Sequence, residues 1–345
     1  MQGMAVFAGA TLAPALLIGL GAVLGGYWAL AALLAMTLLA AALDLLVRLV
    51  PEARAGQEFP AADGLSVVLA CVHFVLLPLA VLALSGGTGI GWGARGAVAL
   101  AAGMWFGQVS NSNAHELIHR TDRRLFRLGM WVYISLLFGH HTSAHRLVHH
   151  PNVGLDSDPN TARKGEGFYH FALRAWRGSF VEGLRAETAR RQGRGGWHPY
   201  RTYALGALAG LALVWALAGG AGLAAWLALA SYAQMQLLLS DYVQHYGLAR
   251  PVSAGGRPAP VGPELSWNAP HWFTTHLMLN APRHSDHHAH PARPYPALRL
   301  AGTGAEPMLP ASLPAMAALA MVPPLWKRVM HPRLAALTKA TGAQG

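Results

Sequence analysis

The sequence predicts an all-α integral membrane protein with six transmembrane helices and a histidine-rich region on one side of the membrane. Apolar residues make up 53% of the 345 residues and charged residues only 12%, whereas about 25% of an ordinary soluble domain is charged. The apolar residues gather in long runs, and nine of the 18 histidines cluster between and after those runs. We therefore treat residues 1–345 as one membrane-embedded domain.

Six stretches are apolar and long enough to cross a bilayer, which takes about 20 residues. They are residues 4–24, 27–50, 65–85, 92–109, 203–218 and 221–239. Alternate connections between them, at Gly25, Ser85–Gly91 and Gly219, are short and almost uncharged. Nearly all charge falls on the other side, mainly in residues 110–202 and 240–345. The positive-inside rule then places both termini and the clustered histidines on the cytoplasmic side of a cell inner membrane.

The net charge of +11 suits membrane lipids with anionic headgroups or an acidic partner protein. A nucleic-acid partner fits poorly with several membrane spans, and we expect none. Two sets of arginines are predicted to contact lipid headgroups or an acidic electron donor. They are Arg120, Arg123, Arg124 and Arg127, then Arg185, Arg190, Arg191 and Arg194.

Cys71, the single cysteine, lies inside an apolar run and is predicted to be buried. One cysteine excludes an internal disulfide and a Cys-x-x-Cys metal site. Redox chemistry would therefore use metal held by histidines and take its electrons from another protein.

The central histidine cluster is the stretch His140–His150, which holds five histidines. His145 and His149 are four residues apart, so on an α-helix they would share one face, and His150 follows directly. A neutral imidazole is the commonest protein ligand for a metal. We interpret His140 and His141 as supporting residues rather than ligands.

His115 and His119 have the same four-residue spacing and flank Glu116. His-Glu-x-x-His also marks zinc proteases, in which the glutamate is the general base. That alternative uses one metal and leaves six further clustered histidines without a role, so we disfavour it.

Further histidines occur towards the carboxyl end. His284, His287 and His288 are spaced to share one helical face, with Asp286 placed to accept the outer ring N–H of a ligand. Asp156, Asp158 and Asp241 are other candidates for that role. His290 lies just beyond and is predicted to be solvated.

His245 is a lone histidine at a predicted helix end. His115 and His245 each lie 23 residues after the outer start of a span, about 35 Å along a helix. They should therefore emerge at a similar depth. Nine imidazoles exceed the needs of one metal and suit two, and imidazole alone accepts zinc, copper, iron or nickel.

The motifs carry a family resemblance. The stretches Asn113–Arg120, His145–His150, Asp158–Arg163, Tyr242–Leu248 and Arg283–His290 resemble those of the membrane-bound alkane 1-monooxygenases. The resemblance implies two non-haem iron ions that use O₂ to hydroxylate the terminal carbon of an apolar substrate taken from the bilayer. It also implies electrons from NADH through a reductase and a rubredoxin. The implied iron ligands are His115, His119, His145, His149, His150, His245, His284, His287 and His288.

The chain departs from that family's usual pattern at Ala144, Val148, Asp241 and Gln244, where Glu, Gly, Asn and Glu are usual. No imidazole is lost. A fatty-acyl desaturase or lipid hydroxylase shares three histidine boxes, and a hydroxylase of alkylbenzene methyl groups is closer still. A metal transporter is the non-enzymatic alternative, but it would place ionisable ligands near the membrane midplane.

Two polar groups within the spans also need an explanation. His73 is predicted either to make packing hydrogen bonds or to line a substrate channel. Asp44 and Arg48, four residues apart, are predicted to form an ion pair.

Overall fold

The computed structural model describes residues 2–47, 60–193, 195–300 and 306–340. Across these ranges the regular structure is helical, and the only extended pairings are two isolated bridges, Val252 with Pro258 and Asn268 with Met308. The all-α prediction is therefore confirmed for the described part of the chain.

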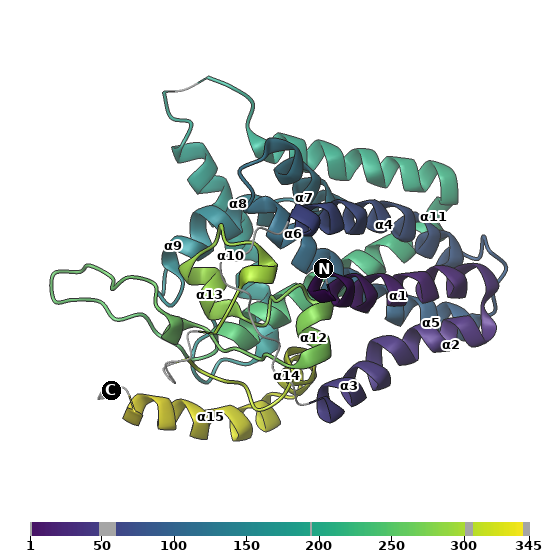
Figure 1. Cartoon of the computed structure of the whole chain (residues 1–345). Coiled ribbons are helices and arrows are strands. Elements are labelled where there is room, and N and C mark those ends of the chain that lie inside the picture. Colours follow the sequence, from purple (N-terminus) through teal and green to yellow (C-terminus); the bar gives the residue numbers. More distant parts are fainter. Residues whose placement is uncertain (1, 48–59, 194, 301–305, 341–345) are drawn as a thin grey trace.

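Four helical segments are long and apolar enough to cross a membrane, namely Gly3–Leu24, Gly26–Leu46, Ala61–Ser85 and Pro199–His245. In Figure 1 the helices that carry them extend to the right of the histidine-rich end. Their elements are α1 (Gln2–Leu24), α2 (Gly26–Leu34), the π-helical turn η1 (Ala35–Leu39), α3 (Ala40–Leu46), α4 (Pro60–Ser85) and α11 (Pro199–His245).

The count of six spans is only partly supported. The predicted stretch 92–109 lies on α5 (Trp92–Trp105), which has 14 residues, and on the π-helical turn η2 (Phe106–Ser110). The last two predicted stretches both lie in α11, which has 47 residues.

Gly219 divides α11 into two halves. Its φ of 60° and ψ of −159° break the helix, and glycine adopts this conformation because it has no Cβ. The halves lie against each other, with Gly210 facing the Trp226 ring (Figure 1).

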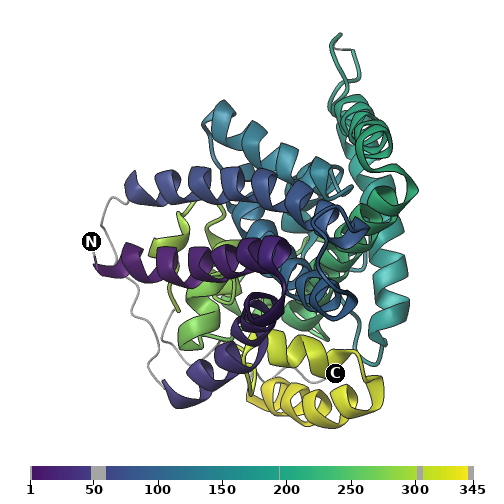
Figure 2. The same cartoon turned by 90° about the vertical axis from the view of Figure 1, so that its right-hand side faces the viewer.

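The other elements gather at one end of these helices, and α14 and α15 pack along one flank (Figure 2). They are α6 (Asn111–Ile118), α7 (Arg123–Ser135), α8 (His141–Ala144), the π-helical turn η3 (His145–His149), α9 (His150–Asn152), α10 (Phe168–Ala189), η4 (Pro263–Leu265), α12 (Trp272–Leu277), α13 (His284–Ala289), η5 (Tyr295–Ala297), α14 (Leu313–Ala320) and α15 (Pro323–Ala340).

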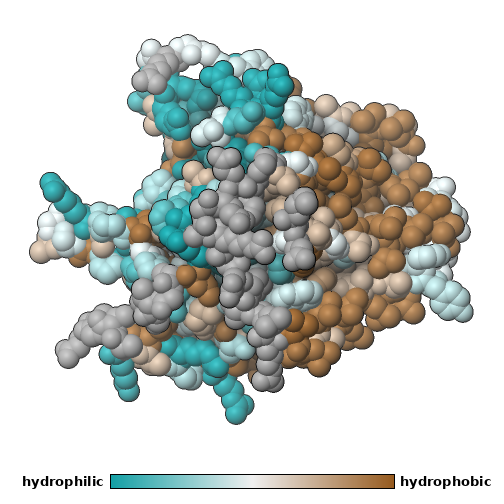
Figure 3. Space-filling view, viewed as in Figure 1, coloured by the Kyte–Doolittle hydropathy of each residue, from teal (hydrophilic) through white to brown (hydrophobic). Residues whose placement is uncertain are grey.

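The membrane-spanning end carries an apolar surface. Tyr27, Leu38 and Leu217 are 91%, 68% and 78% exposed, and Figure 3 shows hydrophobic surface over this end and hydrophilic surface over the other. A patch of this extent marks contact with an apolar phase, so the prediction of a membrane protein is supported. Cys71 is also exposed, and the prediction of a buried thiol was wrong.

Two polar residues in the spans hold elements together. His73 bonds through Nδ1 to Ser110 Oγ at 2.8 Å and through Nε2 to Ser135 Oγ at 2.7 Å. These two hydrogen bonds support the prediction that His73 makes packing hydrogen bonds, rather than the prediction that it lines a substrate channel. The Asp44 carboxylate accepts from the backbone N–H groups of Phe273 and Thr274 at 2.7 and 3.1 Å. It therefore caps α12, and its predicted partner Arg48 lies outside the described residues.

Candidate metal centre

All nine histidines predicted as ligands come together in two groups. Within each group, every histidine has one ring nitrogen that lies within 4.8 Å of one ring nitrogen of each other member. The groups adjoin, because the ring centroids of His150 and His288 are 4.6 Å apart. The first group is His115, His119, His145, His150 and His287, and the second is His149, His245, His284 and His288.

Four segments far apart in the sequence supply these side chains. The end of α6 carries His115 and His119, and α11 ends at His245. The turn η3 with α9 contributes three histidines, and α13 contributes another three. The site therefore lies at the ends of the membrane helices, where helical and connecting segments meet (Figure 1).

The π-helical turn η3 divides its histidines between the two groups. Bonds in a π-helix run from residue i to i+5 instead of i+4. His145 accordingly groups with His150, five residues later, while His149 belongs to the other group. The rings of His145 and His149 are still neighbours, with centroids 5.3 Å apart, but the two residues belong to different groups.

The same division occurs in α13. His284 and His288, four residues apart, belong to one group, and His287 belongs to the other. Two adjacent pairs, His149 with His150 and His287 with His288, thus each serve both groups.

The nitrogen positions fit metal ions. The Nε2 atom of His145 lies 2.7 Å from that of His115 and 2.9 Å from that of His150. In the second group, His284 Nε2 lies 3.1 Å from the Nε2 atoms of His245 and His288. Neighbouring nitrogens bound to one metal at about 2.1 Å are about 3 Å apart. Each imidazole nitrogen carries a single proton or a single lone pair. A cation bound by all three nitrogens therefore explains each of these close groups of three nitrogens best.

His149 shows how a ligand is oriented. Its Nδ1 lies 2.7 Å from an oxygen of Asp158, a buried carboxylate that also accepts from Thr161 Oγ1 at 2.7 Å. Its Nε2 is buried and has no hydrogen-bond partner among the described residues. The N–H on Nδ1 therefore leaves the lone pair on Nε2 directed into the second group.

The protonation states of His115, His145 and His284 agree with metal binding. Burial lowers the pKa of His115 to about 3 and lowers the pKa values of His145 and His284 well below the usual value. These imidazoles are neutral at pH 7, and neutral imidazole is the form that binds a metal. Burial also opposes charge on His149, but the Asp158 carboxylate outweighs it and raises the pKa of His149.

Of the predicted supporting carboxylates, only Asp158 contacts one of the nine histidines directly. Asp241 accepts from Asn160 Nδ2 at 2.6 Å, and Asp156 lies 3.7 Å from Arg163. Asp286 accepts from His290 at 3.0 Å and from Arg293 at 2.6 Å. The prediction that Asp286 orients a ligand was therefore wrong.

The histidines outside the nine have other contacts. His140 Nε2 lies 3.3 Å from Ser179 Oγ, and the His141 ring stacks on Phe138. His290 bonds to Asp286 with a side chain that is 54% exposed.

Glu116 does not act as the protease alternative requires. Its carboxylate lies 2.6 Å from Arg120 and accepts from the Tyr295 backbone N–H at 3.1 Å. Burial raises the pKa of Glu116 to about 7 although Arg120 opposes the shift. The side chain thus joins α6 to η5. Arg120 is held by Glu116 and by Asp63 at 3.1 Å, so it is not part of a free docking patch.

A small cavity of about 50 Å³ reaches both histidine groups, since His115, His145 and His284 line it. Three further residues line this cavity and also a second cavity of about 420 Å³, so the two cavities adjoin. Those shared residues are Gly107, Ser240 and Met278. No motif marks these three residues, so the sequence carries no signal for them.

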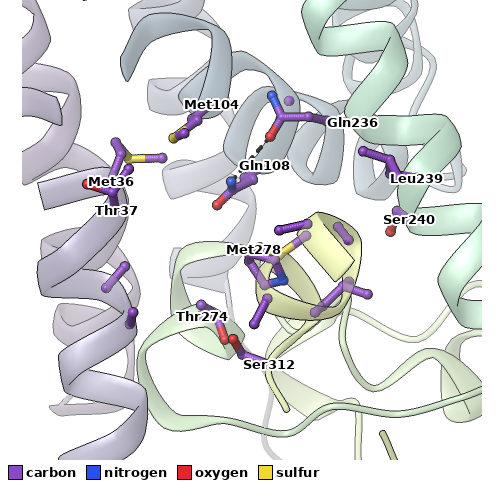
Figure 4. Close-up of a pocket in the computed structure, with 18 of the residues that line it drawn as sticks. Met36, Thr37, Met104, Gln108, Gln236, Leu239, Ser240, Thr274, Met278 and Ser312 are labelled. Carbon is purple, nitrogen blue, oxygen red and sulfur yellow. Dashed lines mark hydrogen bonds between the residues drawn. The ribbon is translucent and has the colours of Figure 1, made fainter. Parts of the chain in front are cut away.

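The larger cavity is apolar and opens on the membrane-spanning surface. Figure 4 shows Met36 and Thr37 on one side, Leu239 and Ser240 on the other, and Met278 between them. Gln108 Nε2 donates to Gln236 Oε1 at 3.2 Å, and Gln236 Nε2 donates to the Gly103 carbonyl at 2.8 Å. Exposed lining residues at the outer end, including Leu38 and Ala318, mark the opening between η1 and α14.

Asp158→Asn is expected to lower metal affinity or activity roughly 10–100-fold. An amide still fills the space, but its NH₂ group competes for the position of the His149 proton. Metal titration of the purified variant checks this. Asp156→Asn, an exposed carboxylate in the same loop, serves as the control, and equal affinity in both variants would contradict the role of Asp158.

Two groups of buried and partly buried histidines at one end of a bundle of apolar helices define a membrane protein with an all-histidine candidate metal site. Residues 90–320 match the model of the fatty acid desaturase family. The chain belongs to that family, and the family resemblance found in its motifs is confirmed.

Several curated relatives are similar to the chain. Alkane 1-monooxygenase 1 of Pseudomonas aeruginosa is 32% identical over 71% of this chain and 65% of its own length. Alkane 1-monooxygenase of Ectopseudomonas oleovorans is 32% identical over 70% of this chain and 61% of its own length. The xylene/toluene monooxygenase hydroxylase component of Pseudomonas putida is 29% identical over 62% of this chain and 57% of its own length. The chain thus spans less than two thirds of the length of the relatives it matches.

Proposed function

We propose that the protein is an O₂-dependent monooxygenase that hydroxylates the terminal methyl group of an alkane or a similar apolar substrate. The observation that carries the proposal is the apolar cavity that opens on the membrane-spanning surface and adjoins the smaller cavity lined by histidines of both groups. Similarity to alkane 1-monooxygenases supports the same reaction.

The nine histidines are proposed as the ligands of two iron ions, divided as the two groups divide. Iron held there would supply the activation of O₂. The protein's own residues orient the imidazoles, as Asp158 does for His149, and exclude water from the substrate. The apolar wall favours an alkyl chain over a polar substrate.

We further propose that electrons come from NADH through a reductase and a rubredoxin-type carrier. The single cysteine, Cys71, leaves the chain without an iron–sulfur ligand set of its own, because such clusters are held by several cysteine thiolates. The electrons would therefore come from a donor outside these 345 residues.

The proposed topology has six crossings of a cell inner membrane, with the histidines on the cytoplasmic side. The crossings would be α1, α2 with η1 and α3, α4, α5 with η2, and the two halves of α11. The distribution of positive charge supports this orientation.

Cysteine labelling tests the topology on a Cys71→Ser background. A cysteine in place of Gly91, where a side chain meets open space, should react with an impermeant maleimide in intact cells. A cysteine at the exposed Ala189 should react only after the cells are lysed. The opposite pattern would reverse the orientation.

Product analysis tests the function. Cells that express the chain with a rubredoxin and its reductase are fed alkanes, alkylbenzenes and acyl lipids under ¹⁸O₂. A primary alcohol carrying ¹⁸O from the alkane is expected by mass spectrometry. Unsaturated acyl chains without alcohol would indicate a desaturase instead, and benzylic alcohol alone would indicate an alkylbenzene hydroxylase. Bound metal without any product would favour a metal-binding protein or transporter.

A further inference from the structure

A third cavity, of about 450 Å³, is lined by none of the nine clustered histidines and is strongly basic. Five arginines from α7, η3 and the end of α10 line it, against one glutamate, Glu187. Five positive charges less one negative charge leave an excess of four. The arginines are Arg123, Arg127, Arg146, Arg190 and Arg191.

Most of this positive charge is uncompensated. Arg191 pairs with Glu187, and the Arg146 guanidinium lies over the Phe126 ring at 4.9 Å. Among the described residues, the side chains of Arg123, Arg127 and Arg190 have no hydrogen-bond acceptor or ion-pair partner. Guanidinium groups around one hollow repel each other, so a bound anion would stabilise the arrangement.

The pocket lies where the surface changes from hydrophilic to apolar. Trp197, which is 59% exposed, and Pro199, the first residue of α11, both line it. The apolar exposed face of α11 begins at Leu205, two residues beyond the lining residue Tyr203, or about 3 Å along the helix. Exposed tryptophans are typical of the membrane–water boundary.

The helix α7, which forms another wall of the pocket, also changes from charged to apolar residues along its length. Trp131 lies four residues beyond Arg127, is 44% exposed and packs beside Gly206 of α11. Figure 3 shows strongly hydrophilic surface directly beside the hydrophobic surface at this edge of the molecule. An occupant of the pocket would therefore meet arginines at one end and membrane-facing side chains at the other.

We propose that this pocket binds the phosphate headgroup of an anionic glycerophospholipid. Guanidinium groups bind phosphate oxygens through paired, charge-assisted hydrogen bonds. The acyl chains would follow the exposed apolar face of α11 past Leu205 and Leu208. A folded acidic protein fits less well, because it would have to enter a concave pocket whose far side faces the bilayer.

The test measures lipid binding by the full chain and is independent of hydroxylation. The protein is placed in nanodiscs of phosphatidylcholine with increasing phosphatidylglycerol, and bound lipid is counted by native mass spectrometry. The variant Arg127→Gln with Arg190→Gln removes two pocket charges. It should weaken phosphatidylglycerol binding about thirtyfold, which corresponds to about 1 kcal/mol for each arginine.

Arg124→Gln with Arg177→Gln is the matched control. These exposed arginines lie on the same two helices but do not line the pocket, so the control should bind as the unchanged protein does. Equal phosphatidylglycerol binding by both variants would overturn the proposal. Inorganic phosphate binding as tightly as the lipid would assign the pocket to a soluble anion instead. Loss of rubredoxin binding with unchanged lipid binding would make it a protein-docking site.

Discussion

Alanine in place of His149 or His284 is expected to abolish hydroxylation and to lower the iron content of the purified protein. Both residues belong to the four-histidine group, where the Nε2 of His284 meets two others and the Nε2 of His149 has no other partner. Removing one of four donors leaves a site that neither encloses nor orients a metal. Elemental analysis and product analysis of the same preparations measure both effects.

His290→Ala is the matched control for His284→Ala, because both residues lie at the ends of α13. His290 is half exposed and contacts Asp286 rather than either histidine group. This variant should retain iron and substantial activity. Equal loss of iron in both variants would show that the division between ligand and bystander is wrong. Stoichiometric zinc without iron in protein from iron-replete cells would contradict the choice of metal.

Met278→Trp is expected to stop hydroxylation of alkanes while the iron content remains. Met278 is buried and lines both the apolar cavity and the smaller cavity beside the histidines. An indole ring there would fill the junction between them. Overpacking of this kind costs about 1–3 kcal/mol of stability, so thermal unfolding is measured beside turnover.

Met278→Leu conserves volume and should keep most of the activity. A second matched pair tests the opening, since Leu38 and Leu45 are exposed leucines of one membrane segment and only Leu38 lines the cavity. Leu38→Trp should lower the yield from long alkanes relative to short ones, and Leu45→Trp should not. Full activity of Met278→Trp would mean that substrate reaches the histidines by another route.

The sequence identified the nine histidines because metal ligation restricts both residue type and spacing. It could not assign them to two groups, because that division depends on a local change of helix type at His145–His149. It favoured Asp286 because this residue is adjacent in the chain, whereas Asp158 reaches His149 through the fold. Proximity in sequence is a weak guide to which carboxylate faces which ring.

The helices were predictable from apolar content, but their ends were less so. The helix α7 runs from Arg123 to Ser135, although its apolar part begins only after Arg127. The Asp122 carboxylate explains the early start, since it accepts from the backbone N–H of Arg124 at 2.6 Å and acts as the N-cap. The apolar cavity could not be predicted from any one segment of the sequence, because residues from Met36 to Met321 line it.

The turn η3 has a consequence for how the chain tolerates length changes. This π-helical turn closes over five residues rather than four, so losing Val148 would move His149 and His150 to the third and fourth positions after His145 and change the side of the turn on which each lies. No conservative replacement at these positions has a comparable effect, since it leaves the angular phase of the following residues unchanged. The spacing between His145 and His150 is therefore under stricter constraint than the identity of the side chains between them, and a single-codon deletion there would be more damaging than most substitutions.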